Sequence, residues 1–370
     1  MDTFIEGIGI VGGFGSDIEA LSEALINRKT QVQSVPYRTN DGDREMPAFL
    51  ADAVRLDAFV PKKALRRADH YSKMALLGAY LALQDAGMTD IDPKSLGIVV
   101  ASGYGASNTT FSFLDSFTVG NDAYSSPTYF SNSVHNAAAA HISILLGATG
   151  PCLTVSQFEM SVPSALITAI HWLREERVER VLFGAVDEYC NILGYCWHRF
   201  FGINKDTLIE PFLFDQQTSI PGEGAAFFLL SRKGDSGKNY GSITGVDTGY
   251  GNRTIPPCPD QTLFILGADG HRDCGQHYGK LITNEMLLSS YSPLYGGFPT
   301  NMAFDMAVAC VSMKEGKIYA LPTGISFPPL LKVVTETQKL DGQQICCLKF
   351  GPHGESGLIT LAPRDLQKKW

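Results

Sequence analysis

The sequence lacks paired cysteines, long apolar runs and an excess of positive charge, and each absence excludes a class of protein. Its eight cysteines form no CxxC pair and no regular framework, which argues against a disulfide-stapled domain and favours a reducing compartment. No apolar run approaches the roughly 18 residues that a membrane span requires. The first residues, MDTFIEGIGIVGGFG, carry no basic segment, so a signal peptide is not expected. We predict a cytoplasmic protein without a membrane span.

Acidic residues outnumber basic ones, with 38 Asp and Glu against 30 Lys and Arg and a formal net charge of -8. This balance gives no general support for binding to nucleic acid or to an anionic membrane. Of the 370 residues, 44% are hydrophobic and 37 are glycine, which is enough for two cores or one large duplicated core. We therefore expect a compact, glycine-rich α/β protein.

One stretch, residues 147–189, organises the rest of the chain. It predicts a short strand at Cys152–Val155, a tight bend, a long amphipathic helix and a second strand at Val181–Val186. In such a βαβ unit the helix N-terminus lies near the end of a strand, where unpaired N–H groups and the helix dipole stabilise anions. Reactive groups are therefore expected at this bend.

The bend resembles the active-site motif of the β-ketoacyl synthases of the thiolase superfamily, which reads roughly G-P-x-x-T-V-D-T-A-C-A-S. The residues in register are Gly150, Pro151, Thr154, Val155 and Ser161. The position of the family's nucleophilic cysteine is occupied by Glu159. The resemblance therefore implies the fold of a synthase without its nucleophile.

The fold implied is thiolase-like, with two duplicated α/β halves stacked in five layers, αβαβα. Two faint repeats agree with a duplication: GSITGVDTGYG resembles IEGIGIVGGFG, and LFILGADG resembles GIVVASGYG. We expect one half at residues 1–232 and the other at 233–370. Within the first half we expect an interface and tunnel segment at about residues 106–150. Its part from 106 to 136 is rich in Phe, Tyr, Ser and Thr with few charges, a composition typical either of a surface buried against a partner or of ordinary core.

The two active-site histidines of the family are also missing. Ala268 or Asp269 stands where the first is expected, with His271 displaced, and Gly297 or Phe298 stands where the second is expected. Condensation needs a thiolate that accepts the acyl chain and donors that stabilise charge as malonyl-carrier loses CO2. No catalytic residue is therefore expected.

Glu159 itself has several possible roles. Ser156 and Glu159 fit an S-x-x-E capping box, in which the glutamate bonds back to the N–H of the cap residue. A salt bridge to a partner subunit is an alternative. A third is residual decarboxylation, similar to what is proposed for family members with glutamine at this position.

A synthase-like chain without catalytic residues resembles the chain-length factor of type II polyketide and aryl-polyene systems. The resemblance implies pairing with an active ketosynthase, work on chains attached to an acyl carrier protein, and no cofactor. It places the residues that line the acyl tunnel at Thr110, Phe113, Leu114 and Phe117. It also makes His135, Asn136 and His141 interface residues. The product could be a polyketide, a polyene or a fatty acyl chain.

Two other classes of function compete with this one. The chain could be a stand-alone malonyl-carrier decarboxylase or acyltransferase that uses Glu159, His271 or Cys152, or it could be a homodimeric acyl-binding protein. Cys152 is expected to be a buried, inert thiol. A metal site at His271, Cys274 and His277 is not expected, because the spacing suits no common zinc motif.

Overall fold

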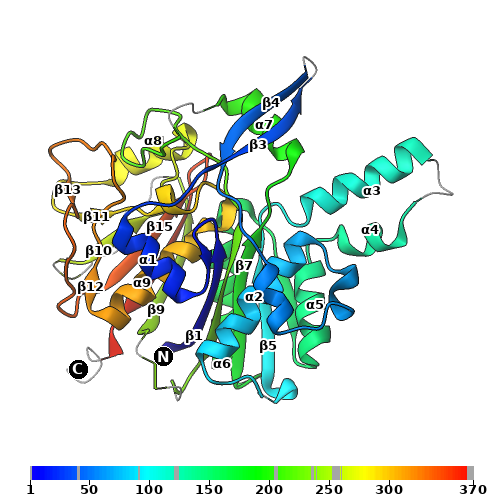
Figure 1. Ribbon diagram of the computed structural model, residues 1–370. Helices are drawn as coiled ribbons and strands as arrows, with labels where there is room; N and C mark the ends of the chain where they lie inside the picture. The colour runs from blue at the N-terminus through cyan, green and yellow to red at the C-terminus, as the bar shows by residue number, and fades with distance from the viewer. Residues whose placement is uncertain are drawn as a thin grey trace.

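The chain folds into two half-sheets that join at one short contact (Figure 1). The computed structural model describes residues 2–39, 42–90, 92–120, 125–203, 207–234, 237–238, 240–251, 259 and 261–364. The first half-sheet has the order β1 (Thr3–Gly12), β8 (Gly224–Ser231), β7 (Arg180–Asp187), β5 (Leu96–Ala101) and β6 (Cys152–Val155). The second has the order β9 (Ser242–Tyr250), β16 (Glu355–Ala362), β15 (Ile345–Phe350), β10 (Leu263–Leu266), β11 (Leu287–Ser289) and β13 (Lys332–Val333).

The two half-sheets repeat the same pattern of strand directions. In the first, β6, β5 and β7 are parallel, and β8 is antiparallel to both β7 and β1. In the second, β11, β10 and β15 are parallel, and β16 is antiparallel to both β15 and β9. The halves join where Thr3 and Phe4 of β1 pair with Ile243 and Ser242 of β9. β1 and β9, which carry the first sequence repeat, therefore hold equivalent places.

Helices separate and cover the half-sheets, giving the five layers predicted from the sequence. α6 (Ser161–Arg174) packs on β5 and β7 and also on β9 and β16. α9 (Met302–Glu315) packs on β10 and β15 and also on β1 and β8, and it is buried along most of its length. α2 (His70–Asp85) and α5 (Ala137–Leu146) cover the first half-sheet, and α8 (Arg272–Leu281) covers the second.

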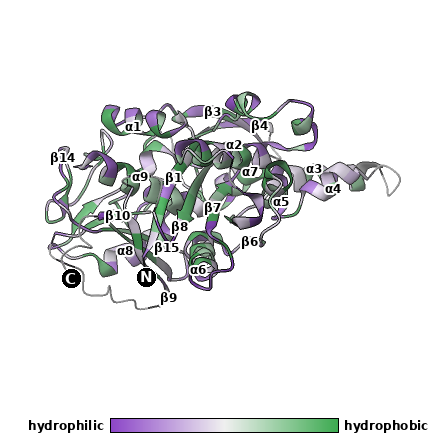
Figure 2. Cartoon of the chain, turned by 90° about the horizontal axis from the view of Figure 1, so that it is seen from below, coloured by the Kyte–Doolittle hydropathy of each residue, from purple (hydrophilic) through white to green (hydrophobic). Residues whose placement is uncertain are grey.

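Two further parts extend from this body. Figures 1 and 2 show α3 (Ser107–Gly120) and α4 (Pro127–Asn132) projecting from the side that carries α5. The hairpin of β3 (Gln33–Thr39) and β4 (Gly42–Ala48) packs with α7 (Asn191–Phe201). The remaining elements are α1 (Ile18–Asn27), β2 (Gly15–Ser16), β12 (Lys317–Ile318) and β14 (Gln338–Lys339).

Small residues allow the closest contact between layers. A Cβ atom added to Gly9 of β1 would lie 2.0 Å from the Gly78 carbonyl oxygen of α2, so the strand and the helix touch through their backbones. Three small residues of the same helix, Ala75, Ala79 and Ala82, are fully buried. The predicted strand Cys152–Val155 is confirmed at both ends. The division of the chain at residue 232, between β8 and β9, stays a prediction. No helix in the described ranges is both long and apolar enough to cross a membrane.

Candidate functional site

Glu159, at the expected position of the nucleophile, lies in the 3₁₀ turn η5 (Phe158–Met160) between β6 and α6. This turn contacts the corresponding turn of the second half, η7 (Pro299–Asn301), and the strands β15 and β16. The carboxyl group is half-buried, and burial raises its pKa although the nearby Lys349 opposes the shift. The bend therefore brings Glu159 to the junction of the halves.

The capping box predicted for Ser156 and Glu159 is wrong. α6 begins at Ser161, and the residue before it makes no side-chain cap. Phe158 has a φ of 45°, a left-handed conformation that bulky residues rarely adopt. It inserts a separate turn before the helix, and the N–H of Gln157 bonds instead to the Ser161 hydroxyl at 2.8 Å. Glu159 is thereby displaced from the helix start that a capping box requires.

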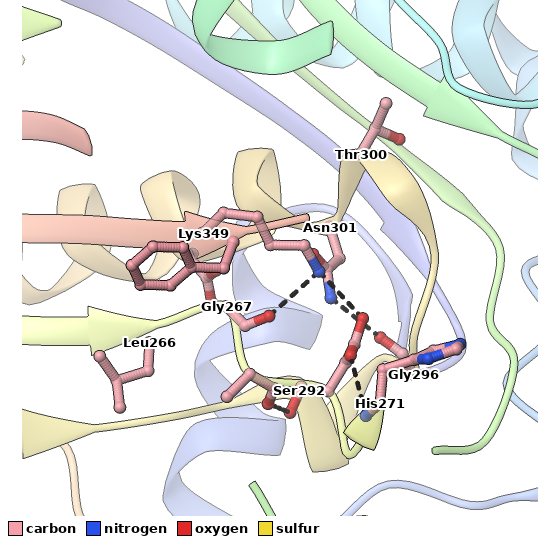
Figure 3. Close-up of polar contacts among 12 residues, drawn as sticks. Leu266, Gly267, His271, Ser292, Gly296, Thr300, Asn301 and Lys349 are labelled. Atoms are coloured by element: carbon pink, nitrogen blue, oxygen red, sulfur yellow. Dashed lines mark hydrogen bonds and ion pairs between the residues drawn. The ribbon is translucent and has the colours of Figure 1, made fainter. Parts of the chain in front are cut away.

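A buried ion pair, whose lysine is drawn in Figure 3, acts on the charge of Glu159. Lys349, on β15, donates from Nζ to Oδ2 of Asp269 at 2.9 Å and to the Gly267 carbonyl oxygen at 3.0 Å. The two charged side chains are 1% and 7% exposed. Asp269 is one of the two residues, with Ala268, expected at the position of the first histidine, and it forms an ion pair at the strand end.

The charges of this pair stabilise each other. Burial alone would raise the pKa of Asp269, but Lys349 holds it below its usual range. Burial alone would lower the pKa of Lys349, but Asp269 and Glu159 keep it raised. Both groups are therefore ionised at neutral pH, and neither can exchange a proton readily with a substrate.

The second histidine position has no room for a side chain. A Cβ atom added to Gly297 would lie 2.7 Å from Oγ of Ser219 and 3.3 Å from Oδ2 of Asp269. Phe298 is 2% exposed and packs its ring edge-on against Phe304 in the core, with the ring centroids 5.2 Å apart. Gly297, and not Phe298, is therefore the residue that faces Asp269.

His271, the displaced histidine, is enclosed by aromatic rings. Its ring centroid lies 4.2 Å from that of Phe201 and 5.4 Å from that of Trp197, both on α7. Burial lowers the pKa of His271, although Asp269 opposes the shift. The imidazole is therefore neutral at pH 7 and packs as part of an aromatic cluster.

Asp187, at the end of β7, holds the two halves together below the ion pair. Its carboxylate accepts hydrogen bonds from the Ser102 hydroxyl at 3.0 Å, from the N–H groups of Gly103 and Tyr104, and from the hydroxyl of Thr300 at 2.9 Å. Thr300 belongs to η7 of the second half. Sequence reasoning missed this residue, and the signal that could have found it is an acidic residue directly after a buried strand.

Two cysteines lie near enough to the bend to be considered as nucleophiles. Cys274 of α8 is buried, and burial together with Asp269 raises its thiol pKa well above the usual range. Cys152 is exposed as a residue, so the expectation of a buried thiol is wrong, although its sulfur lies 3.7 Å from the Ala139 carbonyl oxygen and is partly covered. Burial of the Cys152 sulfur still raises its pKa. Neither thiol is activated for attack.

The cavity beside Asp269 is too small for an organic ligand. The cavity bounded by Ala268, Asp269 and His271 has a volume of about 10 Å³, enough for one water molecule at most. Among the described residues, no three His, Cys, Asp or Glu side chains lie close enough to hold a metal ion. Among the described residues at this bend there is neither an activated thiolate nor a pair of imidazole donors, and Lys349 and Asp269 are already paired with each other.

The expected tunnel residues all lie on α3, outside the body. The hydroxyl of Thr110 bonds to the carbonyl oxygens of Ala106 and Ser133, and the ring of Phe113 packs on Phe130 with centroids 5.4 Å apart. Leu114 and Phe117 are 45% and 48% exposed. Figure 1 shows α3 projecting from the body, and the assignment of these four residues to a tunnel stays a prediction.

The expected interface residues lie on or just before α5. His135 and Asn136 are exposed, and His141 is half-buried with Nε2 3.2 Å from Oδ1 of Asn132. Burial lowers the pKa of His141. The structure thus brings the three residues to one side of the body, the side that carries α3 and α4 (Figure 2).

The structure has a basic cluster that was not predicted from the sequence, because the net charge of the chain is negative. Four exposed cations lie between the turns before α2: Lys62, Lys63, Arg66 and Arg67. Only Lys62 of the four is paired with a carboxylate of the described chain, that of Asp57 at 3.1 Å. The signal was visible in the sequence as PKKALRR, and it marks a local positive surface on an acidic protein.

Comparison with known families shows which family the chain belongs to. Residues 2–236 match the family described as beta-ketoacyl synthase, N-terminal domain. The chain belongs to the β-ketoacyl synthase family. The matched residues include the bend at Glu159.

Curated relatives of this family resemble the chain over most of its length. Polyketide beta-ketoacyl synthase 1 of Streptomyces virginiae is 24% identical over 266 residues, or 68% of this chain. Nodulation protein E of Rhizobium leguminosarum bv. trifolii is 24% identical over 61% of the chain, and 3-oxoacyl-[acyl-carrier-protein] synthase 2 of Staphylococcus aureus strain N315 is 22% identical over 67%. The chain spans only 62%, 57% and 61% of the length of these relatives.

Solved structures confirm the thiolase-like fold over nearly the whole chain. The ishigamide ketosynthase/chain length factor superposes with a TM-score of 0.80 at 15% identity, covering 98% of both chains. A beta-ketoacyl synthase from Burkholderia phymatum superposes with a TM-score of 0.80 at 16% identity, covering 98% of this chain and 99% of the other. A type II polyketide ketosynthase, solved with its acyl-carrier protein, gives 0.78 at 15% identity.

Proposed function

We propose that this chain is a chain-length factor: a non-catalytic cytoplasmic subunit that pairs with an active ketosynthase and shapes the tunnel for a growing carrier-bound acyl chain. One observation carries the proposal. The residues that the motifs align with the thiolate and the two histidines of a synthase are Glu159, Asp269, which is paired with Lys349, and Gly297, which is packed against Ser219.

The chemistry of Glu159 supports a role without covalent catalysis. A carboxylate that accepted an acyl chain would form a mixed anhydride, which is far more reactive than a thioester and would be hydrolysed before elongation. Without imidazole donors nearby, charge that develops during decarboxylation would also remain unstabilised. The residues at the bend therefore suit a packing role at the junction of the halves.

An uncovered apolar surface supports a partner. The exposed apolar side chains on α3, α4, α5 and β6 include Phe117, Phe130, Val134, Ile144 and Leu153. Ile144 is 75% exposed and Phe130 is 60% exposed. β6 ends the strand order, so one of its edges has no strand partner within the described chain. Exposed apolar patches and open strand edges are typical of protein interfaces.

The tunnel follows from the same surface. A partner that covered α3 would enclose Thr110, Phe113, Leu114 and Phe117 between the two chains. Because packed interiors resist even one extra methylene group, bulky side chains at these positions would set the length at which elongation stops. The enclosed chain can be a polyketide, a polyene such as an aryl polyene, or a fatty acyl chain, since the aromatic and aliphatic lining suits all three.

The first test is co-expression with a ketosynthase encoded nearby, followed by size-exclusion chromatography and an elongation assay. We expect a stable one-to-one complex. Its elongation rate should change less than about twofold in Glu159→Ala, because on this proposal Glu159 does not lower the activation free energy of elongation. As a control for the interface, Ile144→Asp should weaken the complex by placing a charge in the apolar surface.

The opposite result would identify an enzyme. If the chain purified alone and turned over acyl or malonyl thioesters, with activity lost in Glu159→Ala, the chain-length-factor proposal would fail. The stand-alone decarboxylase or acyltransferase would then be the function. A stable homodimer that bound acyl groups without turnover would contradict both.

The basic cluster before α2 suits an acidic carrier protein. We predict that Lys63→Glu combined with Arg66→Glu weakens carrier binding to the complex roughly tenfold, since several exposed charge contacts are each worth about 0.2–1 kcal/mol. The wild-type affinity should fall as salt is added, because such contacts are screened. Surface plasmon resonance at two salt concentrations measures both effects. Lys332→Glu, on β13, is the matched control and should leave binding unchanged; equal losses in both variants would contradict the assignment.

A further inference from the structure

A cavity beside the end of α1 lies apart from the surfaces described above. It has a volume of about 750 Å³ and is lined by residues 28–32 and by Thr207, Leu208, Pro293, Pro322 and Thr323. No element of the apolar surface contributes to its wall, and Figure 1 shows α1 on the opposite side of the body from α3 and α4. Its size is that of a small-molecule site.

Arg28 is held in a fixed position at this cavity. Its Nε donates to the Leu321 carbonyl oxygen at 2.6 Å, and its own carbonyl oxygen accepts from the N–H of Thr323 at 3.0 Å. The two terminal nitrogens of the guanidinium make no hydrogen bond within the described ranges. Arg28 therefore presents uncommitted donors from a side chain whose position is already set.

Two further donors accompany Arg28. Lys29 is exposed and forms no ion pair with the described part of the chain. The Thr30 hydroxyl is buried and has no hydrogen-bond partner among the described residues. An unsatisfied buried hydroxyl costs about 1–3 kcal/mol, a cost that a bound acceptor would remove. No acidic side chain lines the cavity.

The backbone of the cavity wall is unusual at two points. Arg28 has a φ of 57° and Thr207 a φ of 51°, both in the left-handed region. For residues other than glycine this conformation costs roughly 1–2 kcal/mol, and β-branched residues such as threonine adopt it least readily. Such conformations concentrate at ligand sites, where the surroundings hold them in place.

The end of α1 does not cancel this positive charge. Arg28 follows the C-terminus of the helix, where the dipole contributes about half a negative charge that cations complement. The two full positive charges of Arg28 and Lys29 exceed the half negative charge of the helix end. The carbonyl oxygen of Ala24 is also already bonded, by the N–H of Lys29 at 3.3 Å. The cavity therefore keeps a net positive potential.

We propose that this cavity binds an organic phosphate. The phosphate group would accept hydrogen bonds from Arg28, Lys29 and Thr30, and the organic part would pack against Val32, Leu208 and Pro322. A phosphate suits this set because its three terminal oxygens and its charge near −2 match two cations and a hydroxyl. This site is independent of the partner surface and of the bend at Glu159.

The test is a titration of the full chain, in complex with its ketosynthase if it purifies that way, with phenyl phosphate and separately with inorganic phosphate. Isothermal calorimetry should show saturable binding of phenyl phosphate at one site, weakened at least tenfold in Lys29→Gln and in Arg28→Gln. Lys332→Gln, an exposed lysine on β13 outside every site described above, should bind as wild type. Since Lys29 makes no contact that supports the fold, its variant separates ligand binding from misfolding.

Three results would overturn the proposal. One is the absence of saturable phenyl phosphate binding in the millimolar range. Another is binding that persists unchanged in Lys29→Gln and in an Arg28→Gln variant with wild-type melting temperature. The last is an affinity for phenyl phosphate no higher than that for inorganic phosphate, which would show that the organic part of the ligand contributes nothing to binding.

Discussion

Lys349→Met is expected to lower the free energy of unfolding by about 3–5 kcal/mol, because it leaves the carboxylate of Asp269 buried without its counter-charge. A loss of this size is a large fraction of the stability of an ordinary domain. Urea denaturation followed by tryptophan fluorescence measures it. Wild-type stability in Lys349→Met would contradict the ion pair.

Two controls separate the lost charge from lost packing. In Lys349→Met with Asp269→Leu neither charge remains, so most of the stability should return. The deficit of the single variant should also shrink at acid pH. Without Lys349, burial raises the folded-state pKa of Asp269 above its unfolded value near 4, so the variant is destabilised as the pH rises through that range and recovers as the carboxyl is protonated.

Restoring the family's catalytic residues is expected to destroy the fold instead of creating a synthase. In the combined variant Glu159→Cys, Asp269→His and Gly297→His, Lys349 loses its partner, at about 3–5 kcal/mol, and a side chain is forced against Ser219, at about 1–3 kcal/mol. The sum approaches the total stability of a typical domain. Circular dichroism and a malonyl-carrier condensation assay test this expectation.

Two further variants test this second prediction more closely. Adding Lys349→Ser to the three substitutions removes the unpaired charge and should recover part of the folded fraction. Glu159→Cys alone should fold normally, because Glu159 is only half-buried, and should still not condense, because no imidazole donor lies at positions 269 or 297. A folded, condensing triple variant would show that the site has kept the space and flexibility of an active synthase.

Much of the fold was predictable because the family's strands and turns carry local signals. The strand Cys152–Val155 and the helix that follows could be assigned from periodicity, and the repeat of β1 in β9 from similar glycine spacing. The position of Glu159 also followed from the motif alone. These features depend on residues that are near one another in the sequence.

The rest of the site depends on contacts between distant residues. The Lys349–Asp269 pair joins positions 80 residues apart, and nothing in the run ICCLKF indicates that its lysine points into the interior. The capping box failed because the left-handed Phe158 adds a turn, which a spacing rule cannot anticipate. Cys152 was expected to be buried because its strand is apolar, but exposure depends on which segments pack over the strand, and Cys152 is exposed.

The place of β1 in the sheet has a consequence for how the chain is made. β1 leaves the ribosome well before its long partner β8, which ends at Ser231, and before its other neighbour β9, which begins at Ser242. At roughly 5–20 residues per second, this apolar strand waits for tens of seconds before its edges can pair. The nascent chain therefore depends on α1 and α2, or on a chaperone, to shield β1 during synthesis.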